Sequence, residues 1–208
     1  MAILAATVKP PHVGILTEYA TAGDAYSFLH DPAMELEPDQ AIRMAIEVAK
    51  GLQYLHDSKS AHGNLKSSNL MLFEDGSVRL IDYAWFKSRF SRFIGTQAIL
   101  YDVEWLPPEV LRDGLPNPED ITSIQSMDIY AFGMLLHEIV TRQYPYDGMN
   151  SMQIGVKVLF EKVTPEIPEY IPETLSNIMT NCWNPDPLSR HSMSEILNDL
   201  QKFQQEGF

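Results

Sequence analysis

The sequence predicts an α+β domain in which a short β portion precedes a mainly α-helical body. Two β-rich runs, residues 3–8 (ILAATV) and 13–19 (VGILTEY), flank a proline-containing turn near the N-terminus. Beyond Gly23 the apolar residues recur every three or four positions, a spacing typical of amphipathic helices. Residues 126–141 are apolar on nearly every side, so we expect this helix to be buried at the centre of the helical body.

The composition is that of a globular protein. Apolar residues make up 45% of the 208 residues and charged residues make up 21%, which excludes the disordered and fibrous classes. A chain of this length suits one globular domain, or one large domain with a small appendage. We therefore assign residues 1–208 to a single domain, with the strands within residues 1–22 and the helical body in residues 23–208.

The first elements in chain order are a strand–turn–strand unit and one long helix. The turn is Lys9-Pro10-Pro11-His12, in which the two prolines mark the end of the first β-rich run. Pro38 is placed to open a helix that ends near His56, because proline is favoured in the first turn of a helix. The apolar stripe of this helix consists of Ala41, Ala45, Val48, Leu52 and Leu55.

A short hairpin and further helices follow. Apolar runs at 69–73 and 77–83 surround Glu74-Asp75-Gly76-Ser77, which is a strong turn signal. Residues 86–125 lack a clear periodicity and predict a long loop with short helical pieces, and loops of such length are usually functional or disordered. The remaining helices are predicted at 126–141, 151–162, 172–182 and 192–205.

Net charge and cysteine content restrict the partners and the compartment. The formal charge of −13 argues against a nucleic-acid partner, which requires clustered Lys and Arg. The single cysteine, Cys182, allows no intrachain disulfide, which predicts a reducing compartment. The apolar neighbours of Cys182 predict that its thiol is buried. No apolar run approaches the roughly 20 residues that cross a bilayer, so we expect a cytoplasmic protein without a membrane segment.

The stretch AHGNLKSSNLML, residues 61–72, carries the most information about function. Taken alone it indicates an ordinary structural loop, because His, Gly, Asn and Ser are common turn formers. Its context changes this interpretation, since further motifs lie on both sides of it in a defined order. These are ILTEYATAGDAYSFLH at 15–30, Asp82 at 18 residues after Asn64, WLPPE at 105–109, Asp128, and Arg190 within NPDPLSRHS.

Together these motifs resemble the protein kinase family. In the order of that family they correspond to the hinge, the catalytic loop, the magnesium-binding aspartate, the end of the activation segment, the aspartate of the central helix and a late arginine. The resemblance extends from about residue 8 to residue 205. It implies a protein-kinase-like fold in which residues 1–22 are the last small-lobe strands and the hinge, and residues 23–208 are the helical large lobe.

The resemblance implies a nucleotide site between the hinge and the predicted hairpin. Thr17 would lie at the back of the adenine pocket, and the backbone of Glu18 and Ala20 would hydrogen-bond the adenine edge. Asp24 would reach the ribose, and Met71 would form the apolar floor of the pocket.

The resemblance also implies a phosphate and magnesium site. Lys66 would contact the transferring phosphate as a point charge, and Asn69 and Asp82 would hold magnesium ions. An amide carbonyl and a carboxylate supply the hard oxygen ligands that magnesium prefers. The cofactors implied are therefore ATP and Mg²⁺, with weak binding expected because of the departures described below.

Two further sets of residues would hold the catalytic loop and the activation segment in place. Asp128 would accept backbone hydrogen bonds from His62 and Gly63, although a simple helix N-cap is an alternative role for this aspartate. Glu109 and Arg190 would form a buried ion pair that ties the end of the activation segment to the helical body. These are predicted to be structural rather than chemical residues.

Several departures from the family pattern predict weak or absent phosphotransfer. Asn64 stands where the family has the aspartate that accepts the substrate proton, and an amide is a negligible base. Gly63 replaces an arginine, and Ala84 replaces a glycine whose backbone freedom lets the following turn switch. The sequence as given also contains no G-x-G-x-x-G motif and no lysine-bearing strand before the hinge.

The function predicted from these residues is that of a pseudokinase that serves protein partners as a scaffold, docking or allosteric signalling module. The alternative is a slow Ser/Thr or dual-specificity kinase whose longer native chain supplies the small lobe. The retained Lys66, Asn69 and Asp82 favour this alternative. A helical domain unrelated to kinases is the third and weakest interpretation.

The subfamily stays open at this stage. Lys66-Ser67-Ser68 follows the Ser/Thr kinase pattern, whereas VEWLPPEVL resembles the tyrosine kinase version of its segment. This mixture suggests the tyrosine-kinase-like group. HGNLKSSN also resembles the kinase-homology modules of receptor guanylyl cyclases and some receptor-like pseudokinases.

Overall fold

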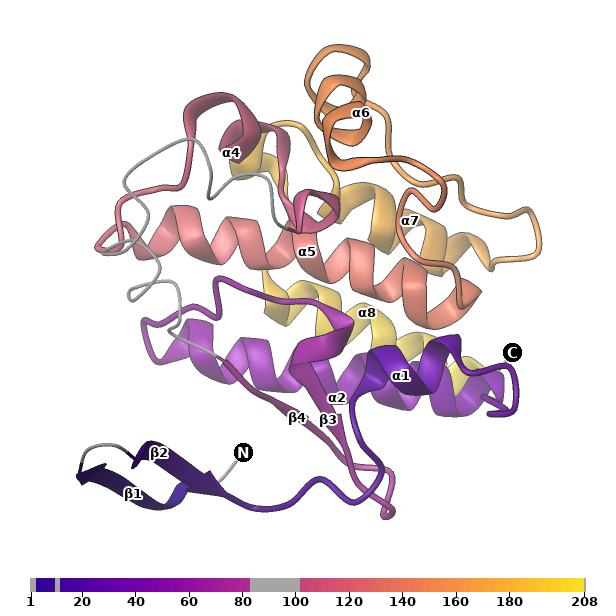
Figure 1. The fold of residues 1–208 in the computed structure, drawn as a ribbon. Coiled ribbons are helices and arrows are strands. Elements are labelled where there is room, and N and C mark those ends of the chain that lie inside the picture. Colours follow the sequence, from indigo (N-terminus) through magenta and orange to yellow (C-terminus); the bar gives the residue numbers. More distant parts are fainter. Residues whose placement is uncertain (1–2, 10–11, 83–101, 208) are drawn as a thin grey trace.

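Two small antiparallel sheets accompany a larger set of helices in the described part of the chain. The structure is a computed structural model, and it describes residues 3–9, 12–82 and 102–207. Figure 1 shows the first sheet at one edge of the molecule, apart from the helices, and the second sheet lying against them. This arrangement confirms the predicted α+β class with its mainly helical body.

The first sheet is a hairpin of β1 (Ile3–Lys9) and β2 (His12–Thr17), which confirms the predicted strand–turn–strand unit. Its register pairs Lys9 with His12 and shifts between Ile3 and Ala5. Its apolar side chains are exposed, including those of Leu4, Val8, Ile15 and Leu16.

The chain then enters α1 (Ala25–His30) and α2 (Pro38–Asp57). The Asp24 carboxylate caps α1 by accepting a hydrogen bond from the Ser27 amide. Pro38 occupies the first turn of α2, and the helix ends one residue beyond His56, as the sequence predicts. The side chains of α2 that are buried include Ala41, Ala45, Val48 and Leu52 from the predicted stripe.

The second sheet is formed by β3 (Leu70–Leu72) and β4 (Val78–Leu80), with Leu70 opposite Leu80. Gly76, in the turn between them, has a φ of 79°, a conformation that favours glycine. The predicted hairpin is thus confirmed with shorter strands. Asn69, at the expected start of its first run, lies instead in the 3-10 turn η1 (Ser67–Asn69).

The central helix α5 (Ile121–Thr141) begins five residues earlier than the predicted start at Ser126. Its cap is Asp120, whose carboxylate accepts a hydrogen bond from the Ser123 amide. The predicted long loop therefore ends sooner, after the 3-10 turn η3 (Val103–Trp105) and the short helix α4 (Pro108–Asp113). The expected burial of the central helix is confirmed, because its side chains from Ser126 to Ile139 are all buried.

The C-terminal part begins with α6 (Ser151–Val156), which continues as a π-helical turn, η4 (Lys157–Glu161), instead of the single regular helix predicted. It ends where Lys162 adopts a φ of 54°. α7 (Glu173–Cys182), the 3-10 turn η5 (Pro187–Ser189) and α8 (Met193–Glu206) follow, with both helices close to their predicted bounds.

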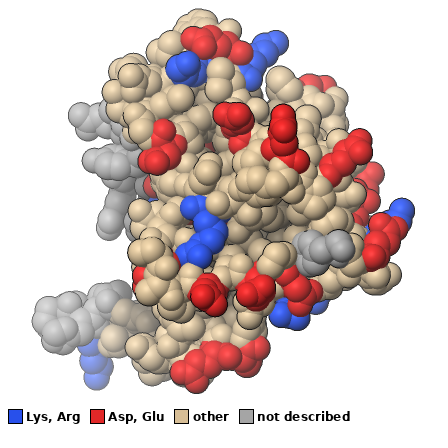
Figure 2. All heavy atoms as spheres, turned by 90° about the vertical axis from the view of Figure 1, so that its right-hand side faces the viewer, with Lys and Arg blue, Asp and Glu red and all other residues tan. Residues whose placement is uncertain are grey.

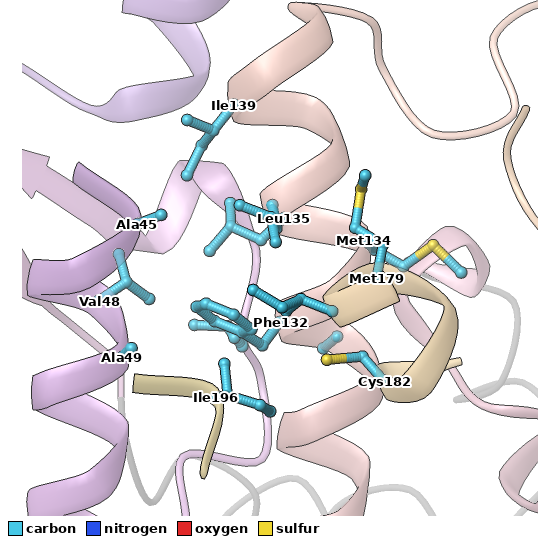
Figure 3. Close-up of a cluster of buried hydrophobic side chains, with 14 of the residues drawn as sticks. Ala45, Val48, Ala49, Phe132, Met134, Leu135, Ile139, Met179, Cys182 and Ile196 are labelled. Atoms are coloured by element: carbon cyan, nitrogen blue, oxygen red, sulfur yellow. The ribbon is translucent and has the colours of Figure 1, made fainter. Parts of the chain in front are cut away.

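The core lies where α2, α5, α7 and α8 meet. Figure 3 shows Phe132 of α5 at the centre of this cluster, with Leu135 of the same helix above it, Val48 of α2 to one side and Ile196 of α8 below. Cys182 of α7 lies in the same cluster, and its full burial raises the pKa of its thiol to about 12. The prediction of a buried structural thiol is therefore confirmed.

Gly133 marks the closest approach of α5 to α7. A Cβ at this position would lie 2.6 Å from the Cβ of Cys182 and 2.7 Å from Nε1 of Trp183. We expect Gly133→Ala to lower the free energy of unfolding by about 1–3 kcal/mol, because a well-packed core must shift to accept the methyl group. Chemical denaturation checks this value. Gly155→Ala is the control, since a Cβ at Gly155 of α6 has no atom within 4 Å and should cause no loss.

Candidate active site

Asp128 organises the loop that connects α2 with β3. Its carboxylate is 1% exposed and accepts hydrogen bonds from the backbone amides of His62 and Gly63, each at 2.7 Å. Nε2 of His56 lies 3.0 Å from the same carboxylate, a contact that the sequence did not predict. The alternative role of Asp128 as a helix N-cap is wrong, because it lies in the second turn of α5 and Asp120 is the cap.

The backbone of this loop at position 63 has a conformation that favours glycine, the residue found there. Gly63 has a φ of 72°, a left-handed conformation that costs a larger side chain more than it costs glycine. The neighbouring His62 side chain is fully buried, and its Nε2 lies 2.8 Å from the carbonyl oxygen of Ile81. Burial lowers the pKa of His62 in spite of the nearby Asp128 carboxylate, which acts in the opposite direction.

Asn64 and Asn69 are brought together within this loop. Nδ2 of Asn69 donates a hydrogen bond of 2.7 Å to the backbone carbonyl of Asn64. The backbone carbonyl of Asn69 accepts a hydrogen bond of 3.0 Å from the Ile81 amide, the residue before Asp82. The two predicted magnesium ligands, Asn69 and Asp82, therefore lie on neighbouring segments.

The donor set of Asn69 and Asp82 fits a magnesium ion that is also bound by phosphate. Asn69 uses its amide nitrogen for the Asn64 carbonyl, and its amide oxygen is of the type that magnesium prefers. Asp82 is exposed and has a φ of 59°, a left-handed conformation that a non-glycine residue adopts at a cost. Among the described residues, no three His, Cys, Asp or Glu side chains form a metal-binding group.

Lys66 has a partner that the sequence did not predict. Its Nζ lies 2.9 Å from both carboxylate oxygens of Asp102, and the two side chains are 22% and 27% exposed. Asp102 precedes η3 and has a φ of 63°. No signal in the sequence indicates this pairing, because Asp102 lies 36 residues from Lys66 in a stretch without periodicity.

The Lys66–Asp102 ion pair borders a cavity of about 220 Å³. Its remaining walls are polar or aromatic and come from α1, η1, η3 and the segment that follows α5. The lining residues are Tyr26, Ser67, Ser68, Trp105 and Tyr144.

The predicted nucleotide residues lie along the connection between the two sheets. Thr17 ends β2, and Glu18 and Ala20 follow it, all three partly buried. Asp24 forms an isolated bridge with Met71 of β3, so the structure brings these two together.

The carboxylate of Asp24 is already engaged within the protein. One of its oxygens accepts from the Ser27 amide at 2.9 Å and the other from the Ser27 hydroxyl at 2.8 Å. A ribose hydroxyl would have to share these oxygens with the cap of α1.

A sequence profile of the family described as protein tyrosine and serine/threonine kinase matches residues 1–200. The chain belongs to the protein kinase family. The matched region includes the loop between α2 and β3, the central helix α5 and the ion pair of Lys66 with Asp102.

Individual relatives of this kinase domain are described as serine/threonine-protein kinases. A probable serine/threonine-protein kinase of Dictyostelium discoideum is 35% identical over 200 residues, which cover 96% of this chain and 21% of that protein. The probable kinase SIS8 of Arabidopsis thaliana is 30% identical over 203 residues, covering 97% of this chain and 19% of SIS8. The kinase CTR1 of the same plant is 32% identical over 202 residues, covering 95% and 24%. The chain therefore spans between 19% and 24% of the length of these relatives.

Glu109 and Arg190 connect distant parts of the kinase domain. Nη1 and Nη2 of Arg190 donate to the two carboxylate oxygens of Glu109 at 2.7 and 2.8 Å. The Arg190 side chain is fully buried and donates further hydrogen bonds to the backbone carbonyls of Ser126 and Asn184. Its guanidinium also lies 5.2 Å from the ring centroid of Tyr130. This arginine therefore joins α4, α5 and the segment before α8.

Surface charge and helix composition bear on the partners of the kinase domain. On the face drawn in Figure 2, basic side chains are separated from one another by acidic and neutral ones. Within the described ranges, no helix combines the length and the apolar character needed to span a membrane.

Ala84, which the sequence identified as a departure from the family, lies outside the described residues.

Proposed function

We propose that this kinase domain is a pseudokinase that serves protein partners as a scaffold or allosteric module, with phosphotransfer severely weakened. The observation that carries the proposal is the amide of Asn64 at the proton-accepting position of the catalytic loop. A positioned general base contributes roughly 10²–10⁴-fold to a reaction rate. An amide forfeits most of this factor, although phosphoryl transfer depends more on positioning and charge than on proton removal.

The pairing of Lys66 supports the same proposal. The ammonium group predicted to contact the transferring phosphate is bound by both oxygens of Asp102. A phosphate must therefore compete with an internal carboxylate for this charge. Loss of the base and occupation of the lysine act on the same step.

The residues that hold the large lobe together are retained, in contrast to the base. Asp128 binds the catalytic loop and Arg190 binds Glu109, both largely buried from solvent. Such contacts maintain a defined protein surface whether or not phosphate is transferred. They are the features that a docking or scaffold module needs.

A cytoplasmic location stays a prediction from the sequence.

A slow protein kinase is the second candidate, favoured by the geometry of Asn69 and Asp82. The hydrogen bond between the Asn69 carbonyl and the Ile81 amide joins the segments that carry Asn69 and Asp82, which supports a magnesium site formed by these two side chains. Thermal unfolding with and without Mg-ATP distinguishes the candidates. Saturation at 100 times Kd would add about 2.7 kcal/mol to the free energy of unfolding. The pseudokinase proposal expects a much smaller gain at millimolar Mg-ATP.

Phosphotransfer from Mg-ATP to a basic protein substrate tests the proposal directly. We expect the wild type to show a low turnover, barely above that of Asp82→Asn, and Asn64→Asp to be about 100-fold faster than the wild type. The gain is placed at the low end of the range for a general base because Lys66 stays paired with Asp102. Robust wild-type turnover that Asp82→Asn abolishes would overturn the proposal and favour the slow kinase.

A further inference from the structure

The ion pair between Lys66 and Asp102 joins the catalytic loop to the segment that precedes α4. Each oxygen of the Asp102 carboxylate lies 2.9 Å from Nζ of Lys66. Both side chains are mostly buried, at 22% and 27% exposure, so water screens the pair less than it would on an open surface. The pair also borders the cavity of about 220 Å³, which gives an external ligand room to approach Lys66.

Asp102 is held in place by the turn that follows it. Its backbone carbonyl accepts a hydrogen bond of 3.0 Å from the amide of Trp105, and Trp105 is 4% exposed and packed in the main core. The Trp105 ring also meets that of Tyr144 edge-on, with 6.2 Å between the ring centroids. The turn therefore fixes the direction from which Asp102 approaches the catalytic loop.

Lys66 is held from the other side. The hydroxyl of Ser67, the next residue, donates a hydrogen bond of 2.8 Å to the buried carboxylate of Glu138 on α5. Both partners of the ion pair thus extend from anchored backbone, so no backbone ordering is needed when they pair. Such preorganisation makes the pair stronger than two flexible surface side chains would be.

We propose that Asp102 is an internal competitor for phosphate at Lys66. A carboxylate resembles one face of a phosphoryl group, because each offers two anionic oxygens to the same ammonium. The Lys66 site accepts an external phosphoryl group only in molecules whose Asp102 has released the lysine. This inference rests on the proposed function, which assigns phosphate contact to Lys66, and it adds the residue that regulates that contact.

Inorganic phosphate is the probe, titrated at constant ionic strength while NMR follows the indole N–H signal of Trp105 beside the cavity. If Asp102 holds Lys66 in about 70 to 90% of molecules, the apparent affinity is reduced about three- to tenfold. We therefore expect Asp102→Asn to bind phosphate about three- to tenfold more tightly than the wild type. Asp102→Gly should give the same gain, and glycine and asparagine both tolerate the left-handed φ of 63° at this position.

Two matched variants separate competition from a general change of charge. Asp113→Asn is the first control, because Asp113, like Asp102, is bound by a basic side chain through both carboxylate oxygens. The pair of Asp113 with Arg112 lies on the exposed surface of α4, so this variant should leave the phosphate affinity unchanged. Adding Lys66→Met to Asp102→Asn should abolish the gain, because the ammonium group that binds phosphate is then absent.

Each other outcome overturns the proposal. Unchanged phosphate affinity in both Asp102 variants shows that the carboxylate does not compete. An equal gain in Asp113→Asn, or a gain that survives Lys66→Met, assigns the effect to net charge. Lower phosphotransfer in Asp102→Asn without tighter phosphate binding would make Asp102 a proton acceptor that replaces Asn64. The titration requires no turnover, so its failure is distinct from a failure of the pseudokinase proposal.

Discussion

Asp128→Ala is expected to lower the free energy of unfolding by about 3–5 kcal/mol. The variant leaves the backbone amides of His62 and Gly63 without their acceptor, and each lost hydrogen bond to a charged group costs about 1.5–3 kcal/mol. Alanine also leaves a small cavity at a position that is only 1% exposed. Denaturant titration monitored by circular dichroism measures the loss.

Asp120→Ala provides the matched control for this prediction. It makes the same chemical change on the same helix, but Asp120 is an exposed cap that accepts one backbone hydrogen bond from Ser123. Its loss should be clearly smaller than that of Asp128→Ala. Equal losses in the two variants would show that the buried contacts of Asp128 with the backbone amides of His62 and Gly63 stabilise the protein no more than the exposed cap of Asp120 does.

Local pattern was sufficient to predict the long helices. The stripe from Ala41 to Leu52 faces the core because side chains three or four residues apart share one side of a helix. The uniformly apolar sequence of α5 likewise predicts its central position. These features depend on residues that are close in the sequence, and therefore each segment carries its own signal.

The start of α5 was predicted wrongly for an identifiable reason. Residues 121–125 carry two apolar side chains, Ile121 and Ile124, which pack in a smaller cluster with Val110 and Met127. Five residues are too few for a periodicity to emerge, so they were assigned to the loop. Asp120 was the available signal, since an aspartate directly before the first apolar residue of a helix is typical of a helix start.

The candidate site divides in the same way between local and distant contacts. The order of the motifs predicted Asn64, Lys66 and Asn69 as site residues, and these three lie in one short loop. It did not identify Asp102, whose side chain meets Lys66 across 36 residues of chain. Nor did it identify His56, which ends a predicted helix and contacts Asp128 across 72 residues. A pairing of single polar side chains over such separations leaves no periodic trace in the sequence.

Arg190→Met is expected to lower the free energy of unfolding by about 3–5 kcal/mol, the usual cost of removing one partner from a buried ion pair. Glu109 would keep its charge with 20% side-chain exposure, and the carbonyls of Ser126 and Asn184 would lose a donor. Differential scanning calorimetry measures the loss, with Arg112→Met as the control because Arg112 and its partner Asp113 are exposed. The double variant Glu109→Met, Arg190→Met should recover part of the loss, since it leaves no uncompensated charge in the interior. A double variant as unstable as the sum of the two single ones would instead mean that the arginine acts mainly through its backbone acceptors, independently of Glu109.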